Sequence, residues 1–135
     1  MSTAIFFYSL NGTTKALAEK QAAETGADVF EVHEVKKRNA FTAFIPGCCL
    51  AMSRKGSAIV PPEADLAKYD EIVIMGPIWA GHPAPAVNSI IELLPAGKSV
   101  SLVCTSGRGG YDLAKTAALV TEKGCTIKET ICHGK

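Results

Sequence analysis

Apolar residues occur along this chain in two kinds of pattern, which predict two kinds of element. Ala4–Tyr8 and Glu71–Gly76 contain short apolar runs with little polar interruption, which is typical of strands buried on both faces. Shorter or alternating apolar segments complete the set of strands. The pattern predicts five strands, over Ala4–Tyr8, Val29–Val35, Glu71–Gly76, Val100–Cys104 and Thr126–His133.

Longer segments with helical spacing lie between these strands. Thr13–Thr25 is rich in Ala, Leu, Glu, Lys and Gln, and Gly26 is a suitable end for a helix there. Apolar residues three and four positions apart form a stripe in Ala86–Leu94. The pattern predicts four helices, over Thr13–Thr25, Phe41–Met52, Ala86–Leu94 and Leu113–Gly124, with a kink at Pro46-Gly47 and a linker at Ile59–Pro62.

The order of the elements predicts how they pack. Strands that alternate with helices favour right-handed crossovers, which place successive strands parallel in one sheet with helices on both faces. We expect residues 1–135 to form a single α/β domain with a doubly wound parallel sheet. In such a sheet the loops at the carboxyl ends of the strands converge on one crevice, where we expect the functional site.

Charge and cysteine content narrow the function classes. Fourteen Lys and Arg against thirteen Asp and Glu give a net charge of +1, which argues against nucleic-acid binding. No apolar run reaches the ~20 residues that span a bilayer, and the N-terminus lacks a signal-peptide pattern, so we expect no membrane association. Five cysteines without a CxxC pair indicate reduced thiols and a cytoplasmic location.

The loop after the first predicted strand runs Ser9-Leu10-Asn11-Gly12-Thr13-Thr14 and leads directly into a helix. Small hydroxyl and amide side chains, free backbone amides and the positive end of the helix dipole suit a phosphate dianion. The same residues also suit a plain turn in which Ser9 or Asn11 caps the helix. The loop alone leaves both interpretations open.

Two further loops follow the third and fourth predicted strands. Gly76–Pro85 contains the only tryptophan, Trp79, which could stack on a planar ligand or fold back over the core. Thr105–Tyr111 contains three glycines, which allow close approach of the backbone to a ligand, and ends in an aromatic residue. By itself this last pattern also fits an ordinary flexible loop.

Together, the three loops resemble those of the flavodoxin-like flavoproteins, and the resemblance extends over nearly the full chain. It rests on the segments Ser9-x-Asn11-Gly12-Thr13-Thr14, Gly76-Pro77-x-Trp79-x-Gly81-x-x-Ala84-Pro85 and Thr105-Ser106-Gly107-x-Gly109-Gly110. The resemblance implies a flavodoxin-like doubly wound five-stranded parallel sheet in the order 2-1-3-4-5, and it implies bound FMN. The flavin would carry the chemistry, so we expect no catalytic side chain and no metal.

The resemblance also assigns cofactor contacts to each loop. The first loop would hold the phosphate, the second would flank the isoalloxazine ring, and the third would contact the pyrimidine side of the ring. The implied FMN-binding residues are Ser9, Asn11, Gly12, Thr13 and Thr14 in the first loop, Pro77, Ile78, Trp79, Ala80 and Gly81 in the second, and Thr105, Ser106, Gly107, Gly109, Gly110 and Tyr111 in the third.

The chain departs from the family in charge and at its C-terminal end. Carrier flavodoxins are strongly acidic, whereas this chain is nearly neutral, which favours a reductase-like role. The sequence stops after the fifth predicted strand, so we expect the C-terminal helix to be absent. Ser99 and Ser101 alternate with apolar neighbours, and Ile127 and Ile131 with polar ones, which predicts a sheet region covered on one side. We expect the other side to be solvated or to form a homodimer.

The loops do not support other chemistries that share this topology. Met75-Gly76 stands where a phospho-acceptor receiver has Asp, and the first loop lacks the Cys and Arg of a low-molecular-weight phosphatase. Neither a P-loop nor a GxGxxG motif follows the first strand. Cys48 lies on an apolar stripe, which favours a structural role for the Cys48-Cys49 pair.

The sequence therefore predicts an FMN-binding flavodoxin-like redox protein, active in electron transfer or in NAD(P)H- or quinone-linked reduction through the flavin. Its partners would be a redox protein, NAD(P)H or a quinone. The alternative is a non-catalytic binding module with the same fold and a degenerate site, against which the intact glycines of the three loops argue. Both an oxidoreductase and an electron carrier fit the pattern.

Overall fold

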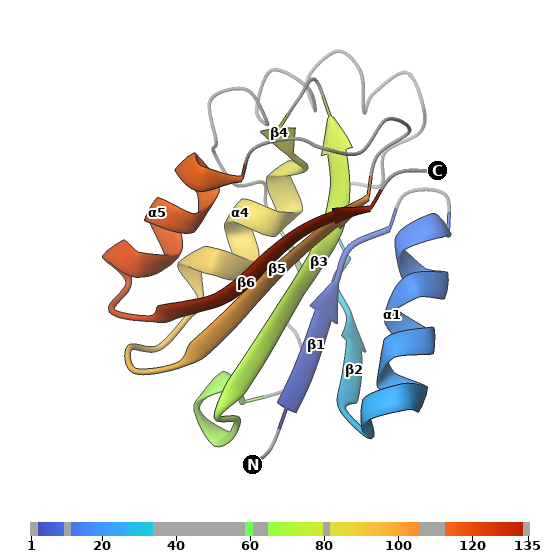
Figure 1. The fold of residues 1–135 in the computed structure, drawn as a ribbon, viewed down its shortest axis with the longest axis horizontal. Helices are drawn as coiled ribbons and strands as arrows, with labels where there is room; N and C mark the ends of the chain where they lie inside the picture. The colour runs from blue at the N-terminus through green and yellow to red at the C-terminus, as the bar shows by residue number, and fades with distance from the viewer. Residues whose placement is uncertain are drawn as a thin grey trace.

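The computed structural model describes residues 3–9, 12–33, 59–60, 65–79, 82–105 and 113–133. Figure 1 shows the elements of this part of the chain with the labels used below. In chain order they are β1 (Thr3–Phe7), α1 (Thr13–Thr25), β2 (Asp28–Glu31), the 3-10 helix η2 (Leu66–Lys68), β3 (Glu71–Trp79), β4 (His82–Pro83), α4 (Pro85–Glu92), β5 (Ser99–Thr105), α5 (Ala114–Glu122) and β6 (Thr126–His133).

Five parallel strands form the sheet, in the order β2-β1-β3-β5-β6 (Figure 1). The short strand β4 lies off this path and pairs with β3 in the antiparallel sense. Among the parallel strands alone, this is the order 2-1-3-4-5 that the sequence resemblance implied. The prediction of the fold class is confirmed.

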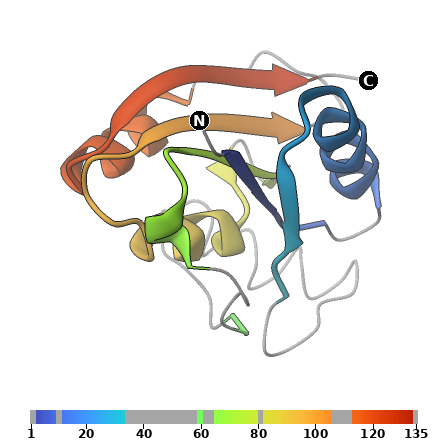
Figure 2. The ribbon, with the colours of Figure 1, turned by 90° about the horizontal axis from the view of Figure 1, so that it is seen from below.

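Helices lie on both faces of the sheet. α1 packs on one face, and α4 and α5 pack together on the other (Figure 1, Figure 2). Alternate residues of each central strand reach the two layers, since Ala4 and Phe6 of β1 belong to the core beside α4 and α5, while Ile5 and Phe7 belong to the core beside α1. This two-sided burial explains why β1 is apolar at almost every position.

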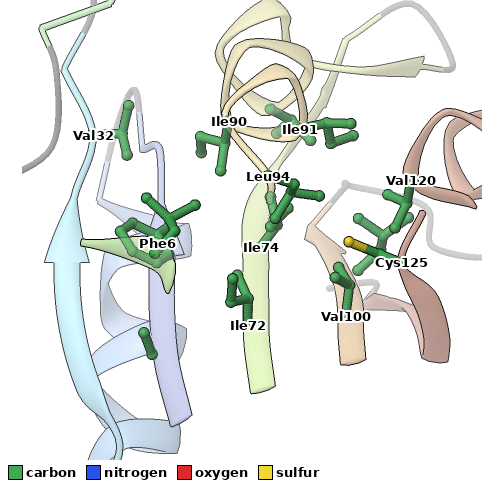
Figure 3. Packing of buried hydrophobic residues seen from close by; sticks show 14 of the residues in the cluster. Phe6, Val32, Ile72, Ile74, Ile90, Ile91, Leu94, Val100, Val120 and Cys125 are labelled. Atoms are coloured by element: carbon green, nitrogen blue, oxygen red, sulfur yellow. The ribbon is translucent and has the colours of Figure 1, made fainter. Parts of the chain in front are cut away.

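The larger core lies between the sheet and the pair of helices α4 and α5 (Figure 3). Phe6, Ile74 and Val100 project into it from three neighbouring strands, and Ile90 and Val120 meet them from the two helices. All five side chains are fully buried. Burial of a side chain of this size contributes about 1.5–3 kcal/mol, so this layer dominates the stability of the fold.

α1 begins and ends where the sequence predicts. Gly26 ends the helix in the left-handed conformation, with φ of 74°, and its N–H donates to the carbonyl oxygen of Ala22 at 2.8 Å. Thr14 and Ala18, one turn apart, are both buried beneath the helix. Their small side chains let α1 lie close to the sheet.

β2 is shorter than predicted. It ends at Glu31, whereas the sequence pattern placed its end at Val35. β2 pairs only with β1, and β1 ends at Phe7, the partner of Glu31. Beyond that point β1 no longer continues the ladder, although the Val32 N–H still donates to the Phe7 carbonyl oxygen at 2.7 Å.

The region between β2 and η2 is described only in part. Ile59 forms a bridge where the sequence predicted a linker, and the Val60 N–H donates to the carbonyl oxygen of His33 at 2.8 Å. The predicted helix over Phe41–Met52, with its Cys48-Cys49 pair, lies outside the described residues.

A register shift in β6 changes which residues face each side of the sheet. The pairing with β5 shifts between Ile127 and Glu129, so Lys128 is an extra residue in β6. As a result Ile127 packs toward α4 and α5, whereas Ile131 packs toward α1. The prediction that Ile127 and Ile131 share a face is wrong, because one extra residue reverses the alternation of the strand.

The extra residue takes part in a polar interaction that crosses the sheet. Nζ of Lys128 on β6 lies 3.2 Å from Oε1 of Glu71 on β3, although β5 lies between these two strands. Thr3 of β1 donates to the other oxygen of the same carboxylate at 3.4 Å. We call Thr3, Glu71 and Lys128 the polar strap. The Lys128–Glu71 ion pair thus spans the width of β5. Ser101 of β5, which the sequence placed on an uncovered side of the sheet, is only 5% exposed.

Candidate functional site

Three strand ends that carry predicted site residues meet at the carboxyl edge of the sheet. Ser9 follows the end of β1, Pro77 lies near the end of β3, and Thr105 is the last residue of β5. The Tyr8 N–H donates to the carbonyl oxygen of Met75 at 3.0 Å, and Pro77 pairs with Thr105 in the sheet register. The backbone therefore holds the three strand ends side by side.

A tight turn leads from β1 into α1. The Gly12 N–H donates to Oγ of Ser9 at 2.9 Å, and Gly12 adopts φ 94° and ψ −8°. An L side chain in this left-handed region costs about 1–2 kcal/mol. No atom lies within 4 Å of the position that a Cβ of Gly12 would take, so the backbone conformation, and not crowding, favours glycine. Ser9 holds the amide of Gly12 and leaves the amides of the next residues to other acceptors.

The first turn of α1 is suited to bind an oxyanion. The first intrahelical hydrogen bond runs from the Ala16 N–H to the carbonyl oxygen of Gly12 at 3.0 Å. Helix geometry therefore leaves the N–H groups of Thr13, Thr14 and Lys15 without intrahelical acceptors. The first turn contains no acidic residue that would neutralise the positive end of the helix dipole. A phosphate group can accept hydrogen bonds from such amides.

Lys15 adds a positive charge to the same turn. Its Nζ lies 3.7 Å from Oε1 of Glu31 at the end of β2, and the two side chains are 49% and 31% exposed. An ion pair this long and this exposed contributes only about 0–1 kcal/mol. Lys15 can therefore exchange Glu31 for a nearby anion at little cost.

A buried hydrogen bond joins α1 to the end of β5. Oγ1 of Thr14 lies 2.8 Å from Oγ1 of Thr105, and either hydroxyl can be the donor. Both residues are buried, with 2% of Thr14 and 8% of Thr105 exposed. Two of the predicted site residues, 91 positions apart in sequence, are thus in direct contact.

A hairpin that the sequence did not predict fixes the end of β3. The last two residues of β3, Ile78 and Trp79, pair with β4, and the Ala84 N–H donates to the carbonyl oxygen of Pro77 at 2.9 Å. The signal was present, because only two residues separate Trp79 from β4, which is the commonest hairpin loop length. The Ile78 side chain packs against the larger core and so anchors the hairpin from within.

Gly76 allows α4 to lie against β3 just below this hairpin. A Cβ at Gly76 would overlap Cγ2 of Val87, which belongs to the first turns of α4. Pro85, the first residue of the helix, suits the first turn because it has no N–H to satisfy. The closely packed α4 supports the strand end from the side opposite α1.

The thiol beside the site is unsuited to nucleophilic chemistry. Burial, with a smaller contribution from neighbouring Cys132, raises the pKa of Cys104 to about 12. The thiol is therefore protonated at neutral pH, whereas a nucleophilic cysteine needs a lowered pKa. Cys104, Cys125 and Cys132 are all free.

Metal and membrane sites were also sought in the described ranges. No group of three or more His, Cys, Asp or Glu side chains in them could hold a metal ion. None of the helices described is long and apolar enough to span a membrane.

The structure describes half of the predicted FMN-binding residues. Ser9 and Gly12 form one turn, Thr14 and Thr105 form the buried pair, and the backbone places the rest at the same edge of the sheet. Described are Ser9, Gly12, Thr13, Thr14, Pro77, Ile78, Trp79 and Thr105, whereas Asn11, Ala80, Gly81, Ser106, Gly107, Gly109, Gly110 and Tyr111 lie outside the described residues.

The sequence matches no protein-family model and no curated protein, but the fold has clear counterparts among solved structures. A flavoprotein from Lactobacillus acidophilus, crystallised in complex with FMN, superimposes with a TM-score of 0.81 at 21% identity, over 97% of this chain and 92% of that chain. A proposed flavoprotein from Bacteroides uniformis gives 0.78 at 25% identity, over 99% and 92%.

A flavodoxin from Megasphaera elsdenii, solved in its two-electron reduced form, superimposes with a TM-score of 0.61 at 20% identity, over 96% of this chain and 84% of that chain. Each of the three superpositions covers nearly the whole of this chain. The chain therefore has the flavodoxin-like fold that its three loops predicted.

Proposed function

We propose that this chain binds FMN at the carboxyl edge of β1, β3 and β5 and acts as a redox protein through the flavin. The observation that carries the proposal is the first turn of α1, whose amides lack intrahelical acceptors and whose sequence lacks an acid. Support comes from the flavoprotein of Lactobacillus acidophilus, which shares the fold and was crystallised with FMN.

The residues at this edge fit the phosphate end of FMN. Gly12 turns the chain without a side chain in the way, and the donors around it are backbone amides and hydroxyl groups. A dianion needs such donors and no competing carboxylate. In this proposal Ser9–Thr14 hold the phosphate, and Pro77–Gly81 and Thr105–Tyr111 flank the ring.

When bound, FMN supplies the ability to take up and release one or two electrons. The residues of this chain bind and orient it, and none of them acts as a general acid or base. The hairpin of β3 and β4 holds the backbone of Trp79 in place, which suits a residue that must keep a fixed position beside a planar ring.

A reductase-like role, in which NAD(P)H supplies electrons to the flavin and a quinone can accept them, fits the composition better than a role as an acidic electron carrier. The net charge of +1 differs from the strongly negative charge with which acidic carriers attract basic partners. A redox partner protein is the other source of electrons consistent with the site. The free thiols of Cys104, Cys125 and Cys132 are consistent with the proposed cytoplasmic location.

A comparison of FMN with riboflavin tests the cofactor assignment. Each ligand is titrated into the purified protein, and flavin fluorescence quenching gives the two dissociation constants. We expect FMN to bind at least about tenfold more tightly, because one charge-assisted hydrogen bond to the phosphate contributes ~1.5–3 kcal/mol. Equal affinities would exclude the phosphate cradle, and no binding of either ligand would leave a non-catalytic module as the explanation.

A second experiment separates the redox roles. The FMN-loaded protein is mixed anaerobically with NADH and with NADPH, and the loss of flavin absorption is followed in time. Rapid bleaching by either nucleotide supports a reductase, with a quinone then tested as the acceptor. Bleaching only by dithionite or by a reduced redox protein would identify an electron carrier.

A further inference from the structure

The buried pair of Thr14 and Thr105 has one proton more than its own hydrogen bond needs. Each hydroxyl carries one proton, and a single proton lies between the two oxygens, which are 2.8 Å apart. The second proton must point elsewhere. Because both residues are buried, a hydroxyl proton without an acceptor would be costly.

The position of Thr14 in the helix limits where its proton can go. Within a helix, a threonine hydroxyl commonly donates to the carbonyl oxygen four residues earlier. α1 begins at Thr13, so the helix itself contains no carbonyl four residues before Thr14. Thr14 lies instead in the turn whose amides are free to bind an anion.

The two possible directions of the Thr14–Thr105 bond therefore differ in consequence. If Thr14 donates to Thr105, its proton is used inside the pair, and Thr14 cannot donate to an anion. If Thr105 donates to Thr14, the proton of Thr14 remains available at the first turn of α1. Hydrogen bonds in a row strengthen one another by polarisation, so an anion at α1 favours the second direction.

We propose that Thr105 is a positioning residue for the phosphate of FMN, which it serves by donating a hydrogen bond to Thr14 and thereby directing the Thr14 hydroxyl proton to the phosphate. This inference rests on the proposed binding of FMN. It assigns a role in phosphate recognition to a residue of β5, the strand whose following loop the sequence resemblance assigned to the ring. The pair thus makes phosphate affinity depend on β5.

Two substitutions at one position test the inference. Thr105→Val keeps the shape of the side chain and removes the hydroxyl, whereas Thr105→Ser keeps the hydroxyl. Dissociation constants for FMN and for riboflavin are measured by fluorescence quenching in both variants. We expect Thr105→Val to weaken FMN binding about three- to fivefold, because the Thr14 hydroxyl keeps its proton but loses the partner that orients and polarises it, and to weaken riboflavin binding by a smaller factor. Thr105→Ser should bind FMN within about twofold of the original chain, since the donor is retained.

Two further measurements separate positioning from a purely structural role. The ³¹P chemical shift of bound FMN should move in Thr105→Val, because the Thr14 hydroxyl that donates to the phosphate is no longer oriented and polarised by Thr105. Thr14→Val and the Thr14→Val/Thr105→Val double variant should show the same ratio of FMN to riboflavin affinity, since Thr105 acts on the phosphate only through Thr14. If Thr105→Val does not fold, Thr105→Ala is used in the same measurements.

The outcomes are distinct. A loss of FMN and riboflavin affinity by equal factors, or an unchanged ³¹P shift, would overturn the inference and leave the pair as a structural contact. FMN affinity in Thr105→Val equal to that of the original chain would also overturn it. Failure of the original chain to bind FMN would instead reject the proposed function.

Discussion

The two faces of the sheet are covered in different ways. Toward α4 and α5, the strands present an apolar surface that two helices bury, with Phe6, Ile74 and Val100 at its centre. Toward α1, one helix buries a smaller apolar cluster, and the polar strap of Lys128 and Glu71 crosses β5. One face is thus held by apolar packing, whereas the other combines a smaller apolar cluster with a partly exposed ion pair.

The difference shows that a residue can be excluded from solvent without contributing much to the stability of the fold. Ser101 of β5 is as inaccessible as many core residues, although its small polar side chain adds little to the apolar core. A partly exposed ion pair contributes little free energy, whereas apolar burial contributes several kcal/mol per cluster. We therefore expect substitutions on the two faces to differ strongly in cost.

The largest contrast is expected between two isoleucines. Ile74→Ala, in the core beside α4 and α5, should reduce the free energy of unfolding by about 3 kcal/mol, because it leaves a cavity in a fully buried site. Ile131→Ala, which makes the same change in partly buried β6, should cost about 1 kcal/mol or less. Urea denaturation of both variants measures the difference. Equal losses of unfolding free energy in the two variants would contradict the view that the core beside α4 and α5 contributes more to stability than the cluster beside α1.

A pH titration should reveal the burial of Cys104 beside the larger core. Its pKa in the folded chain is raised from 9.0 to about 12, so the unfolded chain loses the thiol proton first as pH rises. The stabilisation is complete below pH 9 and is lost between pH 9 and 12, with about 2–3 kcal/mol lost by pH 11. Unfolding free energies at pH 8 and 11 give this slope, and Cys104→Ala should show a shallower one. Parallel slopes would mean that the thiol is ionised in the folded state.

Gly76 tests how closely α4 packs on the sheet. Gly76→Ala should cost about 2 kcal/mol, because the new Cβ overlaps Cγ2 of Val87. Val87→Ala removes that methyl group, so the cost of Gly76→Ala should fall when the two changes are combined. Thermal or urea unfolding of the single and double variants gives the coupling energy. If the two losses of unfolding free energy simply add in the double variant, α4 shifts away from β3 freely when the Cβ is introduced.

The smallest effect is expected at the polar strap. Lys128→Met keeps a long apolar side chain and removes the charge. It should lower the free energy of unfolding by about 0.5 kcal/mol, since the Lys128 side chain is 54% exposed. High salt should produce a similar loss in the original chain and none in the variant. A cost above about 2 kcal/mol, insensitive to salt, would mean that this ion pair behaves as a buried one.

The apolar pattern was sufficient to predict a parallel α/β sheet because most elements are held by local and two-sided burial, whereas the strand order was predicted from the resemblance of the loops. The continuous runs in β1 and β3 indicated central parallel strands, and the segment ending at Gly26 indicated α1. The extra residue Lys128 could not be predicted, because a bulge leaves no mark in the sequence and depends on what its side chain reaches. The extension of β3 beyond Gly76 was missed because the short partner β4 contains Pro83, a residue unfavourable in strands.

For the candidate site, the sequence predicted which residues lie at the carboxyl edge of the sheet better than it predicted the contacts among them. Ser9 and Gly12 were recognisable because the residue preferences of a turn before a helix depend only on neighbouring positions in the sequence. The contact between Thr14 and Thr105 could not be derived, since it depends on the register of β3 with β5 and on the height of α1 above the sheet. The spacing of apolar residues predicts which face of a helix or strand is buried. It does not predict how far that element is shifted along the strand or helix beside it.

The bond between Thr14 and Thr105 also has a consequence for synthesis on the ribosome. α1 can form soon after it leaves the exit tunnel, because its hydrogen bonds are local. Its buried hydroxyl finds a partner only 91 residues later, when β5 has been made and has docked against β3. A nascent chain that stops short of β5 therefore has its helix but lacks the partner of the buried Thr14 hydroxyl. The first turn of α1 reaches its final hydrogen bonding only after β5 has joined the sheet.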